Sequence, residues 1–126
     1  MTRVLVVDDD ELVRETFLDA LGRAGFDVTG AANGKDAEKA LEGTGFDVVV
    51  TDILMPEKDG IETILAIRKG HPDIAIIAVS GGGAMDAIQL LDFARQLGAD
   101  RVVAKPVSPA TLVELVRAVA PRPDGQ

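Results

Sequence analysis

Five polar side chains that could take part in catalysis or metal binding lie at the ends of short apolar runs. They are Asp8 and Asp9 after residues 4–7, Asp52 at the end of residues 48–52, Ser80 after residues 74–79 and Lys105 after residues 101–104. Carboxyl ends of parallel strands open onto one edge of a sheet, so we expect these groups to meet there. Carboxylates held close together repel each other, and a divalent cation with oxygen ligands relieves that repulsion. The pattern therefore predicts a Mg²⁺ site.

Phosphoryl chemistry is the reaction that fits this set of side chains. Mg²⁺ is usually held by one or two carboxylates together with phosphate oxygens. A lysine and a hydroxyl supply the positive charge and the donor that a transferring phosphoryl group needs on its equatorial oxygens. In this interpretation Asp52 is the nucleophile and forms an acyl phosphate, while Ser80 and Lys105 complete the phosphate clamp.

Each of these residues also has an ordinary structural interpretation. The acids from Asp8 onward could simply favour the positive end of a helix dipole, which is the role we assign to Asp10 and Glu11. Asp52 alone could cap a turn, and a lone lysine such as Lys105 is more often solvated. Their shared position at the ends of several apolar runs favours the functional interpretation.

Strands and helices alternate regularly in the predicted structure. Runs typical of buried strands occupy residues 4–7, 26–32, 48–52, 74–79 and 101–104. Apolar residues at helical spacing follow each run, over residues 11–24, 35–41, 61–69, 85–97 and 109–120. Five such units predict an α/β fold, a doubly wound parallel sheet with helices on both faces. The favoured strand order, 2-1-3-4-5, brings the acids after the first strand close to Asp52.

The composition limits the class of protein further. A chain of 126 residues, 47% of them hydrophobic, is enough for one domain, which we expect over residues 1–120 with a flexible tail at 121–126. Twenty-one acidic residues against 13 basic ones give a net charge of −8, which argues against direct contact with nucleic acid. No segment has transmembrane length, and the apolar N-terminal run is too short for a signal peptide. We therefore expect a cytoplasmic protein with no membrane contact.

In this order and spacing the motifs resemble those of the receiver domain of two-component response regulators. The matching motifs are Val6-Val7-Asp8-Asp9-Asp10, Asp52-Ile53-Leu54-Met55-Pro56 with Asp59-Gly60, Val79-Ser80-Gly81, Gly98-Ala99-Asp100 and Lys105-Pro106. The resemblance extends from Arg3 to about Ala120 and implies a flavodoxin-like (βα)5 fold.

Carried over to the matching positions, the resemblance implies a role for each acidic residue. Asp52 would be the residue that is phosphorylated. Asp8 and Asp9 would form the acidic pocket, with Asp9 as the more direct ligand of Mg²⁺. The backbone carbonyl of Leu54 would be a further metal ligand.

The resemblance also implies how the phosphoryl group is bound and sensed. Ser80 would bind it through its hydroxyl and move toward it on activation, and Lys105 would pair with a phosphoryl oxygen and precede a cis proline bond. Val102 stands where the family often has a Tyr or Phe that swings inward with the hydroxyl residue, and Val107 stands where a Phe often follows the Lys-Pro pair. Valine has one stiff rotor and no ring, so the aromatic signal cannot operate in that form.

The implied partners are those of a signalling module. The phosphoryl donor would be a phosphohistidine on a sensor histidine kinase or a histidine phosphotransfer protein, and the output would be contact with a downstream protein target. The simplest version is a stand-alone regulator that is not an enzyme for external substrates, although a piece cut from a longer regulator would look the same.

Two other classes of protein fit the pattern less well. A small Mg²⁺-dependent phosphatase would need a second acid two residues after Asp52, where the chain has Leu54. A flavodoxin-like cofactor-binding protein is disfavoured because the chain has no Trp or Tyr to stack on a flavin and its expected crevice is lined with acids.

Overall fold

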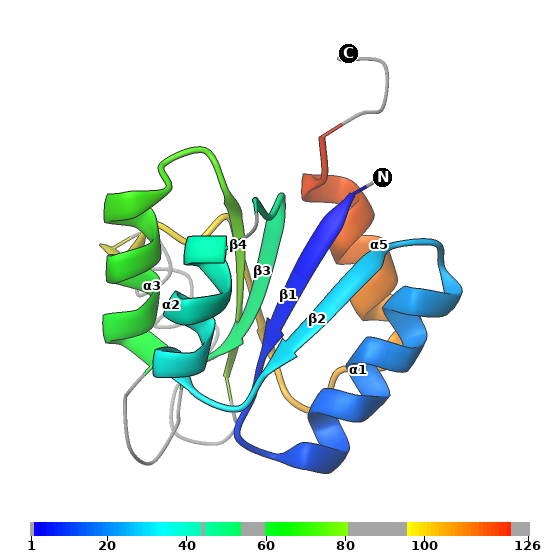
Figure 1. The fold of residues 1–126 in the computed structure, drawn as a ribbon. Helices are drawn as coiled ribbons and strands as arrows, with labels where there is room; N and C mark the ends of the chain where they lie inside the picture. Colours follow the sequence, from blue (N-terminus) through cyan, green and yellow to red (C-terminus); the bar gives the residue numbers. More distant parts are fainter. Residues whose placement is uncertain (1, 44, 54–59, 81–95, 122–126) are drawn as a thin grey trace.

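The computed structural model describes residues 2–43, 45–53, 60–80 and 96–121, and the fold is built from these ranges (Figure 1). The strands are β1 (Arg3–Val7), β2 (Asp27–Ala31), β3 (Val48–Asp52), β4 (Ala75–Ser80) and β5 (Arg101–Ala104). The helices are α1 (Glu11–Arg23), α2 (Gly34–Gly43), α3 (Gly60–Gly70) and α5 (Pro109–Val119). The helix expected over residues 85–97 falls largely outside the described residues.

The five strands form one parallel sheet in the order β2-β1-β3-β4-β5, which confirms the predicted topology. In the register of the sheet, Val7 of β1 lies beside Thr51 of β3, and Asp52 lies beside Val79 of β4. Ser80 in turn lies beside Ala104 of β5. The carboxyl ends of β1, β3, β4 and β5 therefore reach the same edge of the sheet.

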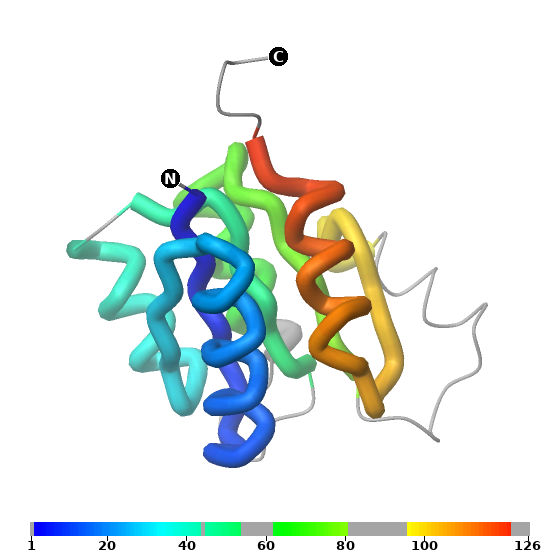
Figure 2. The backbone as a smooth tube through the Cα atoms, turned by 90° about the vertical axis from the view of Figure 1, so that its right-hand side faces the viewer, coloured from blue at the N-terminus to red at the C-terminus, as the bar shows by residue number. Residues whose placement is uncertain are grey.

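Helices cover both faces of the sheet, with α2 and α3 on one side and α1 and α5 on the other (Figures 1 and 2). Side chains alternate between the two faces along each strand, as the geometry of a strand requires. In β1, Leu5 and Val7 join the core on the side of α2 and α3, whereas Val4 and Val6 join the core on the side of α1 and α5. This burial on both faces explains why the central strands are continuous apolar runs in the sequence.

The helix starts follow the capping signals in the sequence. The side chain of Asp10 accepts hydrogen bonds from the backbone amides of Leu12 and Val13. Asp10 therefore caps α1, whereas the sequence predicted for it only a favourable interaction with the helix dipole. Ser108 caps α5 in the same way, by accepting from the amide of Thr111.

One strand boundary differs from the prediction in a way that matters for the site. We expected β4 to end at Val79 with Ser80 in the following loop, but Ser80 is the last residue of the strand. The reason is a backbone pairing that the sequence does not reveal: the amide of Lys105 donates to the carbonyl of Ser80 at 2.7 Å. The backbone of Ser80 is therefore part of the β4–β5 pairing.

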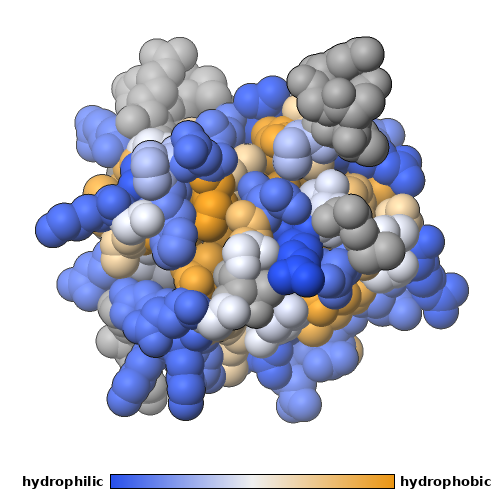
Figure 3. Space-filling model, turned by 45° about the horizontal axis from the view of Figure 1, so that its top comes forward, coloured by the Kyte–Doolittle hydropathy of each residue, from blue (hydrophilic) through white to orange (hydrophobic). Residues whose placement is uncertain are grey.

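The surface at the amino ends of the strands is mainly hydrophilic, with apolar residues visible between the polar ones (Figure 3). Within the described ranges, no helix is both long enough and apolar enough to cross a membrane.

Candidate functional site

The site is built on three carboxylates that two neighbouring strands deliver to the same edge. Asp8 and Asp9 follow β1, and Asp52 is the last residue of β3. One oxygen from each of these carboxylates lies within 4.8 Å of the others. Asp8 and Asp52 are only 1% and 4% exposed, whereas Asp9 faces solvent. The structure therefore brings together the acids that the strand order placed side by side.

Local hydrogen bonds fix the turn that carries the first two acids. The amide of Asp8 donates to the carbonyl of Ala31 in β2 at 3.1 Å. The carboxylate oxygen Oδ1 of Asp8 accepts a hydrogen bond from the amide of Asp10 at 2.9 Å. Because Asp10 also caps α1, the end of β1 and the start of α1 are tied into one rigid turn.

Lys105 links the two buried carboxylates. Its ammonium nitrogen Nζ donates to Oδ2 of Asp8 at 3.0 Å and to Oδ2 of Asp52 at 2.9 Å. The lysine reaches them from the end of β5, just before Pro106, and the bond to that proline is cis, as the resemblance implies. The sequence predicted a lysine at this edge but not that it would join both acids.

The electrostatic environment keeps this lysine charged. Burial alone would lower the pKa of Lys105, but its hydrogen bonds to Asp52 and Asp8, together with the negative charge of both acids, raise the pKa above its ordinary value. The lysine therefore neutralises part of the charge that two buried carboxylates would otherwise leave uncompensated.

The hydroxyl residue lies next to this ion-pair network in the sheet. Ser80 follows Val79, which is the neighbour of Asp52 in the register, and it is 5% exposed. Its backbone carbonyl accepts a hydrogen bond from the backbone amide of Lys105. This bond joins the end of β4 directly to the residue after β5. Residues 81–95, which follow Ser80, lie outside the described residues.

The three carboxylates fit a magnesium ion. They offer hard oxygen ligands from adjacent positions, which is the chemistry that Mg²⁺ prefers in proteins. Asp9 is the most accessible of the three, and its role as the more direct ligand stays a prediction. The backbone carbonyl of Leu54, the further ligand expected from the sequence, lies outside the described residues.

The two valines that replace the aromatic residues common in the family pack on opposite sides of the sheet. Val102 is half-buried and packs against the core on the side of α2 and α3. Val107 packs against the core on the side of α1 and α5. The role of Val102 as a switch residue stays a prediction.

Two arginines make contacts that the sequence gave no reason to single out. Arg14 of α1 donates to the backbone carbonyl of Asp8 at 2.8 Å, directly beside the acidic cluster. Arg68 of α3 donates to the carbonyls of Ile74 and Gly98 at 2.8 and 2.7 Å, near the opposite edge of the sheet. Helical spacing indicates the side of the helix on which each arginine lies, but not which carbonyl its guanidinium reaches.

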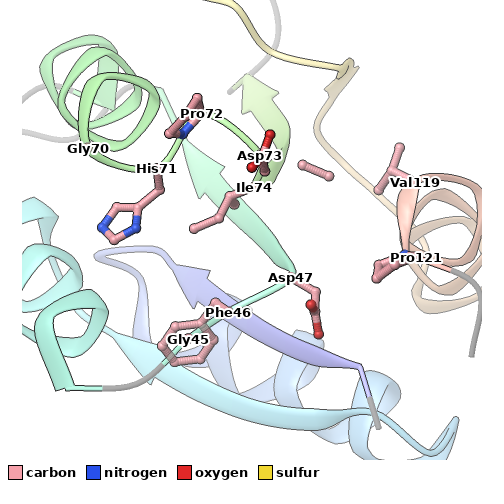
Figure 4. Close-up of a pocket in the computed structure, with 11 residues that line it drawn as sticks. Gly45, Phe46, Asp47, Gly70, His71, Pro72, Asp73, Ile74, Val119 and Pro121 are labelled. Atoms are coloured by element: carbon pink, nitrogen blue, oxygen red, sulfur yellow. The ribbon is translucent and has the colours of Figure 1, made fainter. Parts of the chain in front are cut away.

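A hollow of about 530 Å³ lies at the edge of the sheet away from the carboxylates (Figure 4). Asp47, His71 and Asp73 line it together with apolar residues such as Phe46 and Ile74. It lies at the amino ends of β3 and β4, so it is not part of the phosphate chemistry expected at the carboxyl ends.

The fold and the site together define an α/β domain that can hold a divalent metal and a phosphoryl group at the carboxyl edge of its sheet. Residues 4–117 match the family model described as the response regulator receiver domain. The chain therefore belongs to the receiver domain family of response regulators, as the motifs predicted. This assignment favours a phosphoacceptor in two-component signalling over a phosphatase or a cofactor-binding protein.

Similarity to individual proteins agrees with the family assignment. The chain is 36% identical over 119 residues to the chemotaxis protein CheY of Thermotoga maritima, covering 94% of this chain and 97% of that one. It is 33% identical over 122 residues to the transcriptional regulatory protein CpxR of Escherichia coli, covering 97% of this chain but only 50% of CpxR. The solved structure of TrrA from Thermotoga maritima superposes with a TM-score of 0.80 at 32% identity, covering 94% of this chain and 99% of that one.

Proposed function

We propose that Asp52 accepts a phosphoryl group from a phosphohistidine on a sensor histidine kinase or a histidine phosphotransfer protein. The observation that carries the proposal is the position of the Asp52 carboxylate, which is buried, clustered with Asp8 and Asp9, and hydrogen-bonded to Lys105. A carboxylate in this setting is held in place for in-line attack and is surrounded by groups that stabilise negative charge.

The transfer exchanges one bond to phosphorus for another. A carboxylate oxygen of Asp52 forms the new O–P bond while the N–P bond to the donor histidine breaks. The imidazole of the donor leaves with the electron pair of that bond and takes up a proton from solvent. The ammonium of Lys105, which now donates to both Asp8 and Asp52, would turn its second hydrogen bond to a phosphoryl oxygen. The hydroxyl of Ser80 would donate to another phosphoryl oxygen.

Mg²⁺ is the cofactor that this proposal requires. Asp8 and Asp9 would hold the ion together with Asp52 and the carbonyl of Leu54, and the ion would supply positive charge to the phosphoryl oxygens. The donor chemistry of the acidic cluster supports this assignment. Support also comes from TrrA, a similar protein whose structure was solved in complex with Mg²⁺ and a beryllium fluoride.

The output of the protein would be a change in protein contacts. A phosphoryl group adds negative charge beside Ser80 and Lys105, and the rearrangement of these residues would alter the surface that a downstream protein target reads. We assign this role to a receiver at residues 1–120 with a tail at 121–126. We further propose that the protein works in the cytoplasm, binds neither nucleic acid nor membrane directly, and catalyses only its own phosphorylation and dephosphorylation.

Mass spectrometry of the intact protein tests this function. Incubation with Mg²⁺ and acetyl phosphate should add the mass of one phosphoryl group, with acetate as the leaving group, and Asp52→Asn should abolish the gain. Asp47→Asn makes the same change just before the amino end of β3 and should phosphorylate like the wild type. A wild-type protein that gains no mass with this donor would overturn the proposal.

A further inference from the structure

The guanidinium of Arg14 acts on the backbone that carries the acidic cluster. Arg14 is half-buried in α1, and its NH1 group donates to the carbonyl oxygen of Asp8 at 2.8 Å. That oxygen belongs to the peptide group that joins Asp8 to Asp9. The hydrogen bond therefore fixes the plane of the peptide from which the exposed acid, Asp9, extends.

The rest of the turn is already bonded on both sides of Asp9. On one side the Asp8 carboxylate accepts from the amide of Asp10 at 2.9 Å. On the other side the carbonyl of Asp10 accepts from the amide of Arg14 at 2.9 Å, as part of the first turn of the helix. Arg14 thus closes the turn twice, through its backbone at Asp10 and through its side chain at Asp8.

The neighbouring strand leaves room for this side chain. A Cβ atom added at Gly30 of β2 would come within 2.9 Å of Cδ1 of Leu18, 3.3 Å of Cδ of Arg14 and 3.6 Å of its Cγ. The aliphatic stem of Arg14 therefore lies over the backbone of Gly30, and a side chain there would crowd Leu18 first and the Arg14 stem next. The absence of a side chain at Gly30 leaves the space in which the Arg14 stem runs toward the Asp8 carbonyl.

We propose that Arg14 is a positioning residue of the metal site, which orients the Asp9 carboxylate toward Asp8 and Asp52 by holding the peptide group between Asp8 and Asp9. The inference rests on the proposed function, because it assumes that Mg²⁺ binds these carboxylates. Groups that orient metal ligands from outside the coordination shell typically change metal affinity by about 10–100-fold.

Positioning and simple charge predict opposite signs for this effect. Arg14 is a cation beside a cation-binding cluster, so its charge alone repels Mg²⁺, and its removal would then tighten binding. If Arg14 acts by positioning, its removal weakens binding because Asp9 loses its fixed orientation. The direction of the change in Mg²⁺ affinity therefore separates the two roles.

Titration of the protein with Mg²⁺ alone, followed through the amide resonances of Asp9 and Asp10 by NMR, provides the test. Arg14→Ala should weaken Mg²⁺ binding about tenfold. Arg14→Lys should recover part of the affinity because an ammonium can still donate to the Asp8 carbonyl. The control is Arg23→Ala, which removes an exposed arginine of the same helix that pairs with Asp19, and it should bind Mg²⁺ like the wild type.

Gly30→Ala tests the same idea without removing the guanidinium, and it serves if Arg14→Ala fails to fold. Crowding of the Arg14 stem should again weaken Mg²⁺ binding. Wild-type or tighter binding by a folded Arg14→Ala would overturn this inference alone, as would unchanged binding by Gly30→Ala. A wild-type protein that binds no Mg²⁺ would overturn the proposed function and this inference with it.

Discussion

At the scale of single residues, Lys105 is the cation that joins the two buried carboxylates of the site. Two carboxylates at 1% and 4% exposure would repel each other, and each would lose most of its hydration. The ammonium group between them makes a charge-assisted hydrogen bond to each, at 3.0 and 2.9 Å. Lys105 therefore supplies positive charge where the bound metal and phosphoryl group are expected to come together.

Replacement of this lysine should make the protein depend on the metal. Lys105→Met keeps an unbranched side chain of nearly the same length but removes the charge. Because the lysine is 22% exposed, we expect a loss of about 2 kcal/mol in the free energy of unfolding without metal. Saturating Mg²⁺ should recover part of that loss, since the ion supplies the missing positive charge. Urea unfolding with EDTA and with Mg²⁺ measures both values, and an equal loss in the two conditions would contradict this role.

The raised pKa of Lys105 predicts how this stabilisation depends on pH. A lysine whose pKa is raised on folding stabilises the protein fully below its unfolded pKa, and the stabilisation is lost as the pH rises through the folded value. The difference in unfolding free energy between wild type and Lys105→Met should therefore stay constant from about pH 6 to about pH 9 and shrink above about pH 10.4. Urea unfolding in a series of buffers checks this, and a difference that shrinks between about pH 6 and about pH 9 would be inconsistent with it.

Some residue contacts could not be predicted from the sequence. The ends of apolar runs identified Asp8, Asp9, Asp52 and Lys105, because a charged group beside a buried strand stands out. The sequence did not reveal that Lys105 joins two carboxylates or that Arg14 reaches a carbonyl. Both contacts depend on the direction of a long side chain in three dimensions, for which periodicity gives only a face of the element.

At the scale of elements, the strength of each sequence signal follows the position of its strand in the sheet. Every residue of β3 is buried, so its run of apolar residues is unbroken and was easy to identify. Strand β2 forms an edge and is mostly exposed, which explains its weak pattern and its shorter extent than the expected 26–32. Strand β4 ends at Ser80, one residue later than expected, because its pairing with β5 continues to that residue.

Arg68 is expected to stabilise the amino ends of β4 and β5, which lie at the opposite end of the strands from the carboxylates. Its guanidinium donates to the carbonyls of Pro72, Ile74 and Gly98 and pairs with Asp100, which itself accepts from the amide of Ile76. Arg68→Ala should lower the free energy of unfolding in urea by about 2 kcal/mol, because three carbonyls, two of them in partly buried hydrogen bonds, lose a charged donor.

The same variant should leave the chemistry of the site unchanged. Arg68 acts near the amino ends of β4 and β5, so phosphoryl uptake by a folded Arg68→Ala should equal that of the wild type. Lys69→Ala removes the adjacent, exposed cation of α3 and should change neither property. Phosphoryl uptake should be measured without denaturant, at a temperature at which Arg68→Ala is fully folded. A loss of uptake under these conditions would show that contacts at the amino ends of β4 and β5 affect the site.

At the scale of the whole molecule, the site lies at the carboxyl ends of the strands, between the helix layers on the two faces of the sheet. In β5, which precedes Lys105, Val102 packs toward α2 and α3, whereas Val103 packs toward α1 and α5. Movement of β5 on phosphorylation would therefore be felt on both faces. Without an aromatic ring at position 102, we expect the signal to travel through the backbone of β4 and β5, which the hydrogen bond from Lys105 to Ser80 joins.

The overall architecture was predictable because several independent signals agreed. Alternating strands and helices required a parallel sheet, the right-handed crossover rule limited the strand orders, and the chosen order placed the acids of β1 beside Asp52. The family assignment over residues 4–117 followed the same motifs. The parts that were missed are individual contacts: the link from Lys105 to two carboxylates, the hydrogen bond from Arg14 to a carbonyl and the backbone pairing of Ser80. None of them changes the topology.

The central claim is that Asp52 carries the phosphoryl group, and chemical trapping tests it most directly. Borohydride reduces an aspartyl phosphate to the alcohol, which converts that aspartate into homoserine, and peptide mass spectrometry then locates the changed residue. After incubation with Mg²⁺ and acetyl phosphate, we predict homoserine at position 52 and none when EDTA removes the metal. Homoserine at Asp8, Asp9 or any other acid in place of Asp52 would contradict the account.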